Sequence, residues 1–195
     1  MIRFATDYDI KDIVKIHVSE LGNSFLSSLG NNFLSIFYRS ILHSNLSFII
    51  VAEFDGKCVG FVAGTTDTNL FYNEFIKKNF IQLSFVLLPK LFSGQVIKKI
   101  YEIKRYAGNN ESGLPRSELL FMAVLDKHKL KMIGTSLFNG LLLEMQKRKV
   151  KSIKVIVGDT LAKSKHFYEK NGLVFHSRGY IHKNSPSIIY THNLK

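Results

Sequence analysis

Apolar residues recur along this chain with two different periods, and these periods predict where helices and strands lie. Residues 2–5 have the composition of a short strand, and helical spacing follows over residues 10–17 and again over residues 33–42. Residues 47–65 contain two apolar runs on either side of an Asp55-Gly56 turn, which is the pattern of a β-hairpin. The first third of the chain is therefore expected to contain both strands and amphipathic helices.

The second half of the chain predicts both strands and helices. We expect strands over residues 117–124, 152–157, 173–178 and 187–194, and helices over residues 133–147 and 162–170. Between the two halves, apolar residues at helical spacing over residues 69–107, interrupted at Pro89 and Gly94, predict two or three inserted helices. The pattern predicts an α/β (α+β) fold, in which residues 1–195 form one domain with a helical insertion at 69–107.

The composition is that of a globular protein, because 46% of the 195 residues are hydrophobic and 22% are charged. The longest apolar runs are far shorter than the roughly 18 residues that a membrane-spanning helix needs. Residues 1–7 lack the apolar core of a signal peptide. The one cysteine, Cys58, lies in an apolar run and is expected to be a buried small residue rather than a reactive thiol. We therefore expect a cytoplasmic protein.

Basic residues outnumber acidic ones and give the chain a formal net charge of +12. The stretch from Lys127 to Lys170 holds 11 Lys and Arg residues against three acidic residues. On charge alone such a balance indicates a solvated basic face first, and otherwise a polyanionic partner: nucleic acid, an anionic membrane surface or a phosphorylated small molecule. Because no nucleic-acid-binding motif accompanies the charge, we expect the small molecule, with no nucleic acid and no membrane as partner.

The most informative segment is a strand that runs into a basic turn and then into a helix. The strand begins at Glu118, and the helix begins near Ile133. A helix N-terminus presents unpaired N–H groups and a partial positive charge, so it binds phosphate. Gly134 lets a ligand approach the backbone closely, and the turn adds the cationic side chains of Lys127, Lys129 and Lys131.

This segment resembles the acetyl-CoA signature of the GCN5-related N-acetyltransferase (GNAT) superfamily, which runs Val-x-Pro-x-x-Arg-Gly-x-Gly-Ile-Gly-x-x-Leu. At matching spacing the chain keeps Val124, Ile133, Gly134 and Leu137. Lys129 replaces the arginine, and the proline and the first two glycines are replaced by Asp126, Leu130 and Met132. The cation and the last glycine of a pyrophosphate loop are thus retained.

A second block resembles the same family, whose members commonly show Asn-x-x-Ala-x-x-Phe-Tyr-x-Lys-x-Gly-Phe. The matching residues are Phe167, Tyr168, Lys170 and Gly172. Leu161 stands where the family usually has the asparagine that contacts the cofactor, so that contact is expected to be missing. The start of the chain and the hairpin also resemble the family, which implies the GNAT fold: a mixed central sheet of about six to seven strands flanked by helices.

The resemblance implies acetyl-CoA as co-substrate and assigns catalytic roles. In the family a tyrosine at the position of Tyr168 protonates the departing thiolate, and some members carry a glutamate base six residues before Val124, which here is Glu118. Backbone N–H groups around Ala123 and Val124 would stabilise the oxyanion. The cofactor contacts that the resemblance implies are Ala123, Val124, Lys129, Leu130, Lys131, Met132, Ile133, Gly134, Thr135 and Phe167.

The residues alone leave other roles open for both catalytic candidates. Tyr168 could instead be a core residue that packs its ring against the sheet. Glu118 could be a strand-end carboxylate in solvent. The seven histidines show no metal-ligand spacing, so no metal is expected.

The expected activity is transfer of an acetyl group from acetyl-CoA to a primary amine of a small molecule, with an amino sugar as the analogy-based choice. One alternative is a degenerate member that binds acyl-CoA as a sensor or partner module without turnover. Another is protein or peptide N-acetylation, which needs an open groove. A homodimer is left open.

Overall fold

The computed structural model describes residues 1–22, 24–91, 113–128, 132–182 and 185–194. Its strands form one seven-stranded sheet in the order β1-β2-β3-β4-β5-β7-β6. All neighbouring pairs are antiparallel except β4 and β5, which are parallel, so the expected mixed sheet is confirmed. The strands are β1 (Ile2–Phe4), β2 (Ser47–Phe54), β3 (Lys57–Thr65), β4 (Glu118–Val124), β5 (Ser152–Gly158), β6 (Val174–His182) and β7 (Ser185–Asn193).

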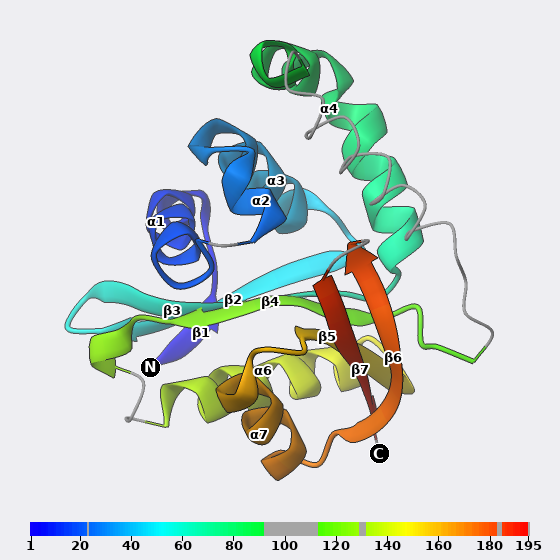
Figure 1. Ribbon diagram of the computed structural model, residues 1–195. Helices are drawn as coiled ribbons and strands as arrows, with labels where there is room; N and C mark the ends of the chain where they lie inside the picture. The colour runs from blue at the N-terminus through cyan, green and yellow to red at the C-terminus, as the bar shows by residue number, and fades with distance from the viewer. Residues whose placement is uncertain (23, 92–112, 129–131, 183–184, 195) are drawn as a thin grey trace.

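Helices cover both faces of the sheet (Figure 1). One layer holds the first four α-helices, and the opposite layer holds α6 and α7. The described helices are η1 (Asp7–Asp9), α1 (Ile10–Glu20), α2 (Phe25–Ser28), α3 (Asn31–His43), α4 (Thr68–Leu91), η2 (Asp126–His128), α6 (Ile133–Lys147) and α7 (Ala162–Lys170).

Two apolar cores lie on either side of the sheet because successive strand residues point to opposite faces. On β2, Ile49 and Val51 belong to the core under α1 and α3, whereas Phe48 and Ile50 belong to the core under α6. Residues 47–52 are buried throughout, as expected for a strand covered on both faces.

The inserted segment is only partly as predicted. A single helix, α4, is described from Thr68 to Leu91, the last described residue of this segment, and it continues through Pro89, so the predicted break at that proline is wrong. The remainder of the insertion, including Gly94, lies outside the described residues. The last two strands extend beyond the predicted ranges of 173–178 and 187–194, because β6 reaches His182 and β7 already begins at Ser185.

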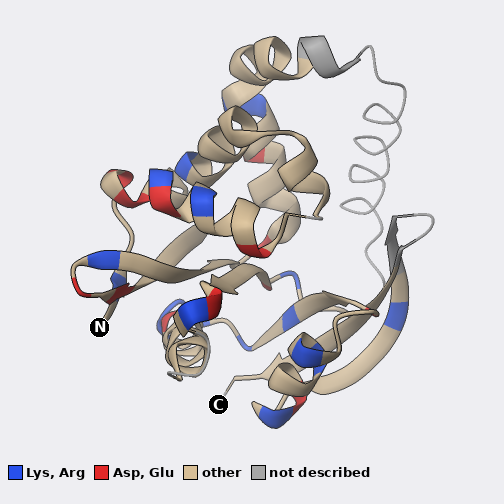
Figure 2. Cartoon of the chain, turned by 60° about the vertical axis from the view of Figure 1, so that its left-hand side comes forward, with Lys and Arg blue, Asp and Glu red and all other residues tan. Residues whose placement is uncertain are grey.

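Lys and Arg residues lie on helices of both layers and on the strands of the C-terminal half (Figure 2). On α7, Lys165 is paired with Asp159 at 3.0 Å between Nζ and Oδ1. Within the part of the chain that the structure describes, the basic excess is thus spread over the molecule rather than gathered in one stripe.

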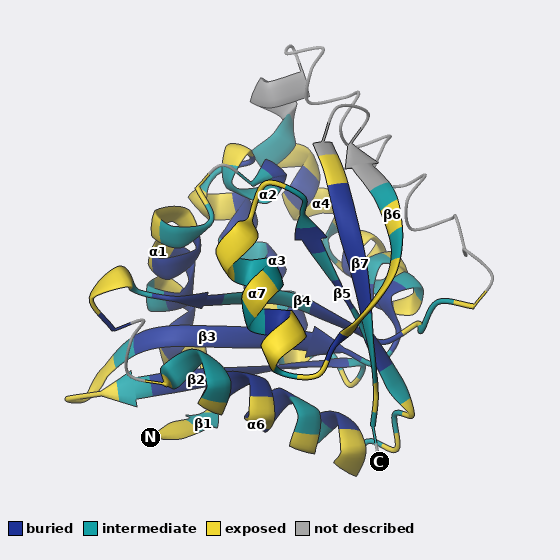
Figure 3. Cartoon of the chain, turned by 60° about the horizontal axis from the view of Figure 1, so that its bottom comes forward, coloured by how far each residue is buried: buried dark blue, intermediate teal, exposed yellow. Residues whose placement is uncertain are grey.

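The sheet divides into two halves at the junction of β4 and β5. Parallel pairing is limited to Glu118 with Lys154 and Leu119 with Val155. Beyond this point β5 continues to pair with β7 over its whole length, whereas β4 stays with β3. Figure 3 shows the two halves diverging from this junction. The edge of β4 from Leu120 to Val124 therefore faces a gap in the ladder.

Candidate functional site

The backbone of β4 presents alternate peptide groups to this gap. Leu125 donates its N–H to the carbonyl of Val59 at 2.9 Å, and Ala123 lies opposite Phe61 in the same register. Because peptide groups alternate in direction along an antiparallel strand, Ala123 bonds toward β3. The N–H and C=O groups of Met122 and Val124 then point away from β3, toward the gap. The polar edge predicted around Ala123 and Val124 is therefore formed by Met122 and Val124.

A β-bulge lies where β4 leaves β5. Ala63 pairs with Phe121 and Gly64 pairs with Leu119, so Leu120 is the extra residue. Bulges bend a strand and increase its local twist. The bulge therefore provides a physical reason for the separation of β4 from β5 directly after Leu119.

The N-terminus of α6 follows the C-terminal end of β4 in the chain. The first helical bond runs from the Ser136 N–H to the Met132 carbonyl at 3.0 Å, so the N–H groups of Ile133, Gly134 and Thr135 have no partner within the helix. Met132 is exposed and has a left-handed backbone with φ of 56°. Three predicted cofactor contacts in the preceding turn lie outside the described residues: Lys129, Leu130 and Lys131.

Gly134 and Phe167 lie next to each other, as expected if both contact one cofactor. A Cβ atom added to Gly134 would meet only the ring of Phe167, at 3.6 Å, which is an ordinary contact. The half-buried Phe167 ring packs at right angles to Phe138 of α6, with 6.0 Å between centroids. The second half of α7, which carries Phe167, is thus placed against the first turn of α6.

Tyr168 is buried on the same side of the sheet. Its ring lies 5.4 Å from that of Phe167 and 6.1 Å from that of Phe138, and only 7% of the residue is exposed. Burial raises the pKa of Tyr168 above its ordinary value, so the phenol stays protonated at neutral pH. The ring does pack in the core, and the chemistry that remains for its hydroxyl is that of a neutral hydrogen-bond and proton donor.

Glu118 lies on the other face of the sheet, under α4. Its Oε2 accepts a hydrogen bond from Thr68 Oγ1 at 3.0 Å and lies 3.8 Å from Lys154 Nζ. The residue is only 8% exposed, so the solvated strand end considered above is wrong, because α4 covers it. Burial raises the pKa of Glu118, and the Lys154 charge and the Thr68 hydrogen bond oppose this shift. Glu118 and Tyr168 therefore flank the sheet from opposite sides.

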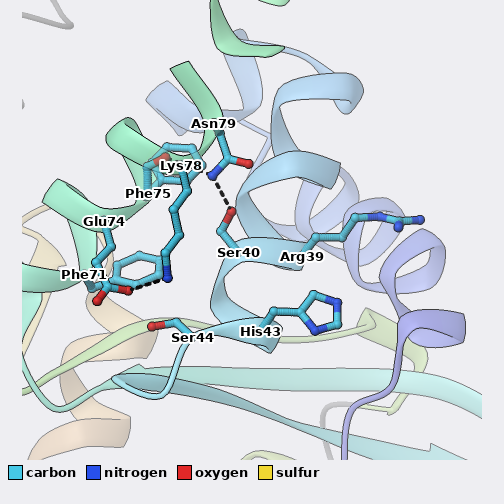
Figure 4. Close-up of a pocket in the computed structure, with 9 residues that line it drawn as sticks. All are labelled: Arg39, Ser40, His43, Ser44, Phe71, Glu74, Phe75, Lys78 and Asn79. Atoms are coloured by element: carbon cyan, nitrogen blue, oxygen red, sulfur yellow. Dashed lines mark hydrogen bonds and ion pairs between the residues drawn. The ribbon is translucent and has the colours of Figure 1, made fainter. Parts of the chain in front are cut away.

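A separate groove of about 190 Å³ lies between α3 and α4 (Figure 4). Two pairs of its polar groups are engaged with each other: Asn79 donates to Ser40 Oγ at 2.9 Å, and Lys78 pairs with Glu74 at 3.2 Å. Neither Glu118 nor Tyr168 lines it. The groove is thus distinct from the gap beside β4.

The described residues contain no group of three or more His, Cys, Asp or Glu side chains arranged to hold a metal ion. The described helices include none that is both long and apolar enough to cross a membrane. Cys58 is half-buried, and burial raises the pKa of its thiol to about 11, so it is not a reactive thiolate at neutral pH.

Sequence reasoning missed Lys154, Thr68 and Met122. Lys154 did carry a signal, because it is a cation inside an otherwise apolar strand, between Ile153 and Val155. Thr68 precedes the insertion, and nothing in the sequence indicates its contact with Glu118. Met122 could not be identified, because the direction of its peptide groups depends on the register between β3 and β4.

The sequence model of the Acetyltransferase (GNAT) family matches residues 11–173, and a search of curated proteins gives no match. Similar solved structures, each aligned over 100% of this chain, include Ard1 from Thermoplasma volcanium, at 15% identity and a TM-score of 0.65 over 97% of that chain. The ribosomal-protein-S18-alanine N-acetyltransferase from Escherichia coli is 13% identical, with a TM-score of 0.63 over 94% of its chain. An N-acetyltransferase from Staphylococcus aureus Mu50 is 14% identical, with a TM-score of 0.66 over 98%. At these identities the likeness shows the fold, which is the expected GNAT fold.

Proposed function

Because the chain belongs to the Acetyltransferase (GNAT) family, as the resemblance implied, we propose that it transfers an acetyl group from acetyl-CoA to a primary amine of a small molecule. The observation that carries the proposal is the end of β4–β5 pairing at Leu119. It leaves the peptide groups of Met122 and Val124 directed into a gap that leads toward the N-terminus of α6. We treat residues 1–195 as a single catalytic domain.

The gap fits the chemistry of coenzyme A, whose pantetheine arm carries peptide-like amides and whose other end carries phosphates. The amides would pair with the β4 edge as an added strand does. The phosphates would accept hydrogen bonds from the first N–H groups of α6. The proposed binding residues are Val124, Lys129, Leu130, Lys131, Met132, Ile133, Gly134, Thr135 and Phe167, with Met122 in place of Ala123, whose peptide groups bond to β3. Once bound, acetyl-CoA supplies an acyl group activated as a thioester.

The catalytic residues would act from the two faces of the sheet. Glu118 takes a proton from the ammonium form of the acceptor, because an ammonium nitrogen has no lone pair with which to attack. Tyr168 keeps its hydroxyl protonated in its buried site and donates to the departing sulfur. The Met122 N–H points into the gap, where it can donate to the developing oxyanion. No metal takes part in this proposal.

The position of Glu118 under α4 favours a small acceptor. Thr68, at the start of α4, contacts the carboxylate directly, so the helix narrows the approach to the base from that side. This supports a small primary amine, with an amino sugar as the specific choice. A non-catalytic acyl-CoA sensor is disfavoured, because it has no need of a buried carboxylate and a protonated phenol.

A second candidate, N-acetylation of a protein or peptide, is favoured by one observation. Solved structures with the same fold include the ribosomal-protein-S18-alanine N-acetyltransferase from Escherichia coli and a ribosomal-protein-alanine N-acetyltransferase from Brucella melitensis. These matches are 13% and 17% identical to this chain, so they give a reason to test the substrate class.

The test is a thiol-release screen of the full chain with acetyl-CoA and a panel of amino sugars, polyamines, amino acids and peptides. The proposal predicts release with at least one small primary amine, with acetylated product seen by mass spectrometry. Release only with peptides would move the assignment to the second candidate. Binding of acetyl-CoA without release across the panel would support the sensor.

A further inference from the structure

A buried polar cluster lies where β4 and β5 part. Its centre is the Glu118 carboxyl group, which receives one partner from α4 and one from β5. The Glu118 and Lys154 side chains are only 11% and 13% exposed. Buried ionisable groups cost free energy unless they are paired and hydrogen-bonded, so the stability of this cluster depends on the partners of Glu118 and Lys154.

Lys154 faces Glu118 because of strand alternation. Ile153, Val155 and Val157 belong to the core under α6 and α7. Lys154 therefore points to the opposite face, where its Nζ lies 3.8 Å from Glu118 Oε2. At this separation and burial the ammonium group favours the ionised carboxylate. Lys154 thus supports the form of Glu118 that can accept a proton.

Thr68 has two acceptors for one hydroxyl hydrogen. Its Oγ1 lies 3.0 Å from Glu118 Oε2 and 2.8 Å from the Arg116 carbonyl oxygen. That carbonyl also accepts the Thr68 backbone N–H at 2.9 Å. When Glu118 is ionised, the hydroxyl can donate to the carboxylate, and the Arg116 carbonyl keeps the backbone bond.

Protonation of Glu118 can reverse the direction of the hydrogen bond with Thr68. A hydroxyl both donates and accepts. The protonated carboxyl can donate to Thr68 Oγ1, which turns its own hydrogen to the Arg116 carbonyl. In both protonation states Glu118 thus keeps its hydrogen bond with Thr68, and the Arg116 carbonyl keeps at least the Thr68 backbone N–H. A buried general base that cycles between two protonation states needs a partner of this kind.

We propose that Lys154 and Thr68 are positioning residues that support Glu118 through both halves of a proton-transfer cycle. The inference rests on the proposed function, in which Glu118 is the base. In the forward step an N–H bond of the acceptor ammonium breaks, its electron pair stays on nitrogen, and an O–H bond forms on Glu118. The proton later passes from Glu118 to solvent.

Among the described residues, the other ionisable groups around the cluster are either neutral or paired with another residue. Tyr72 of α4 faces Glu118, and burial and then the Glu118 charge raise the pKa of that phenol, so it stays neutral. Arg116 is paired with Asp67, with 3.6 Å between NH1 and Oδ2. Lys154 is therefore the cation placed to act directly on Glu118.

The test follows the titration of Glu118 by carbon NMR on the full chain, with side-chain carboxyl-labelled glutamate and Glu118→Gln to assign the signal. Lys154→Met is compared with Lys154→Arg, and Thr68→Val with Thr68→Ser. We expect Lys154→Met to move the midpoint to higher pH, and Thr68→Val to move it less, because the hydroxyl serves both states. The arginine and serine variants are expected to keep the wild-type midpoint.

The same variants are then assayed for the pH dependence of kcat/KM with acetyl-CoA and an amine that is active in the screen. The acidic limb should follow each NMR midpoint. An unchanged or lower midpoint in folded Lys154→Met overturns the inference. If Lys154→Met does not fold, equal kcat/KM profiles of Thr68→Val and Thr68→Ser overturn it, because loss of the Thr68 hydroxyl then costs nothing in either protonation state.

The NMR titration needs neither acetyl-CoA nor an acceptor, so the two proposals fail separately. A wild-type chain that does not bind acetyl-CoA contradicts the proposed function, whatever the midpoints are. A wild-type chain that turns over, with midpoints that do not respond to Lys154 or Thr68, contradicts only the inference.

Discussion

The hydroxyl of Tyr168 can be separated from its ring, because the ring contacts with Phe138 and Phe167 are available to phenylalanine as well. We predict that Tyr168→Phe lowers kcat by about 10²-fold, the lower end of what a positioned proton donor contributes. The KM for acetyl-CoA should change little. Steady-state kinetics measure both values, and thermal unfolding is the control for packing. An unchanged kcat would mean that Tyr168 is only a core residue.

The burial of His17 makes the stability of the protein depend on pH. The residue is fully buried and bonds Tyr38 through Nδ1 at 2.6 Å and Ser24 through Nε2 at 3.1 Å. Burial lowers its pKa from 6.5 to about 4. The unfolded chain therefore binds the proton more readily, so this contribution is fully present above pH 6.5 and is lost as the pH falls toward 4.

As the pH falls from 6.5 to 4, the unfolding free energy is expected to drop by roughly 3 kcal/mol, since one pKa unit corresponds to about 1.4 kcal/mol. Urea unfolding at a series of pH values measures it. His17→Gln, which keeps hydrogen-bonding groups but does not titrate, should flatten the curve over this range. An equally steep curve in the variant would assign the pH dependence to other groups.

Single residues differ in how far the sequence could reveal them. Gly134 and Tyr168 were identified because they occupy fixed positions in short local motifs, and the structure brings Gly134 and Phe167 together. The burial of Glu118 could not be predicted, because it depends on α4, which begins 50 residues earlier in the chain. The sequence pattern left both a buried and a solvated carboxylate open there, with the solvated strand end slightly favoured.

At the scale of elements, the N-terminus of α6 carries a strained residue. Met132 has a left-handed backbone with φ of 56°, a conformation that costs a non-glycine residue about 1–2 kcal/mol. The family has glycine at this position. We predict that Met132→Gly stabilises the protein by up to about 1 kcal/mol, after the greater entropy of glycine in the unfolded chain is counted. Chemical denaturation measures the change, and a clear loss of stability would contradict it.

Two glycines of α6 provide a matched pair of variants. Gly134→Ala should leave the fold intact, because the new methyl group meets only Phe167 at 3.6 Å, yet it should weaken acetyl-CoA binding about tenfold or more by obstructing the ligand (about 1.4 kcal/mol). Gly140→Ala should instead destabilise the fold and leave acetyl-CoA affinity unchanged, because its methyl group would lie 3.1 Å from Ile2 Cδ1.

Calorimetric titration with acetyl-CoA, together with thermal unfolding, separates the two effects. Equal affinity in Gly134→Ala and the wild-type chain would place the ligand elsewhere.

Most described elements could be predicted because their periodicity is local. The hairpin of β2 and β3, the helix α6 and the strand β5 all lie within a few residues of the predicted ranges. The bulge at Leu120 could not be predicted, since it is a property of the register between β3 and β4. The extent of β6 was underestimated, because pairing with β7 prolongs it to His182.

At the scale of the whole molecule, the net charge of +12 should support the binding of a polyanionic ligand. We predict that acetyl-CoA affinity falls several-fold when salt is raised from about 0.05 M to about 0.5 M, because screening shortens the range of charge interactions. Calorimetric titration at several salt concentrations measures the slope. A salt-independent affinity would mean that backbone contacts alone hold the phosphates.

The layered architecture could be predicted because the order of elements and three motif blocks agreed with one family. The separation of the two halves of the sheet was not readable from composition or periodicity, since it arises from which strands pair beyond Leu119. The acceptor amine is likewise not encoded in a local motif, because its surroundings combine α4, β4 and β5.

The most direct test of the account is the unfolding midpoint of the full chain measured with increasing acetyl-CoA, with acetate and a free thiol as matched controls. A ligand that binds only the native state stabilises it by about 2.7 kcal/mol at 100 times its Kd. We expect a midpoint that rises with acetyl-CoA concentration and does not respond to the controls. No rise at millimolar acetyl-CoA would contradict it.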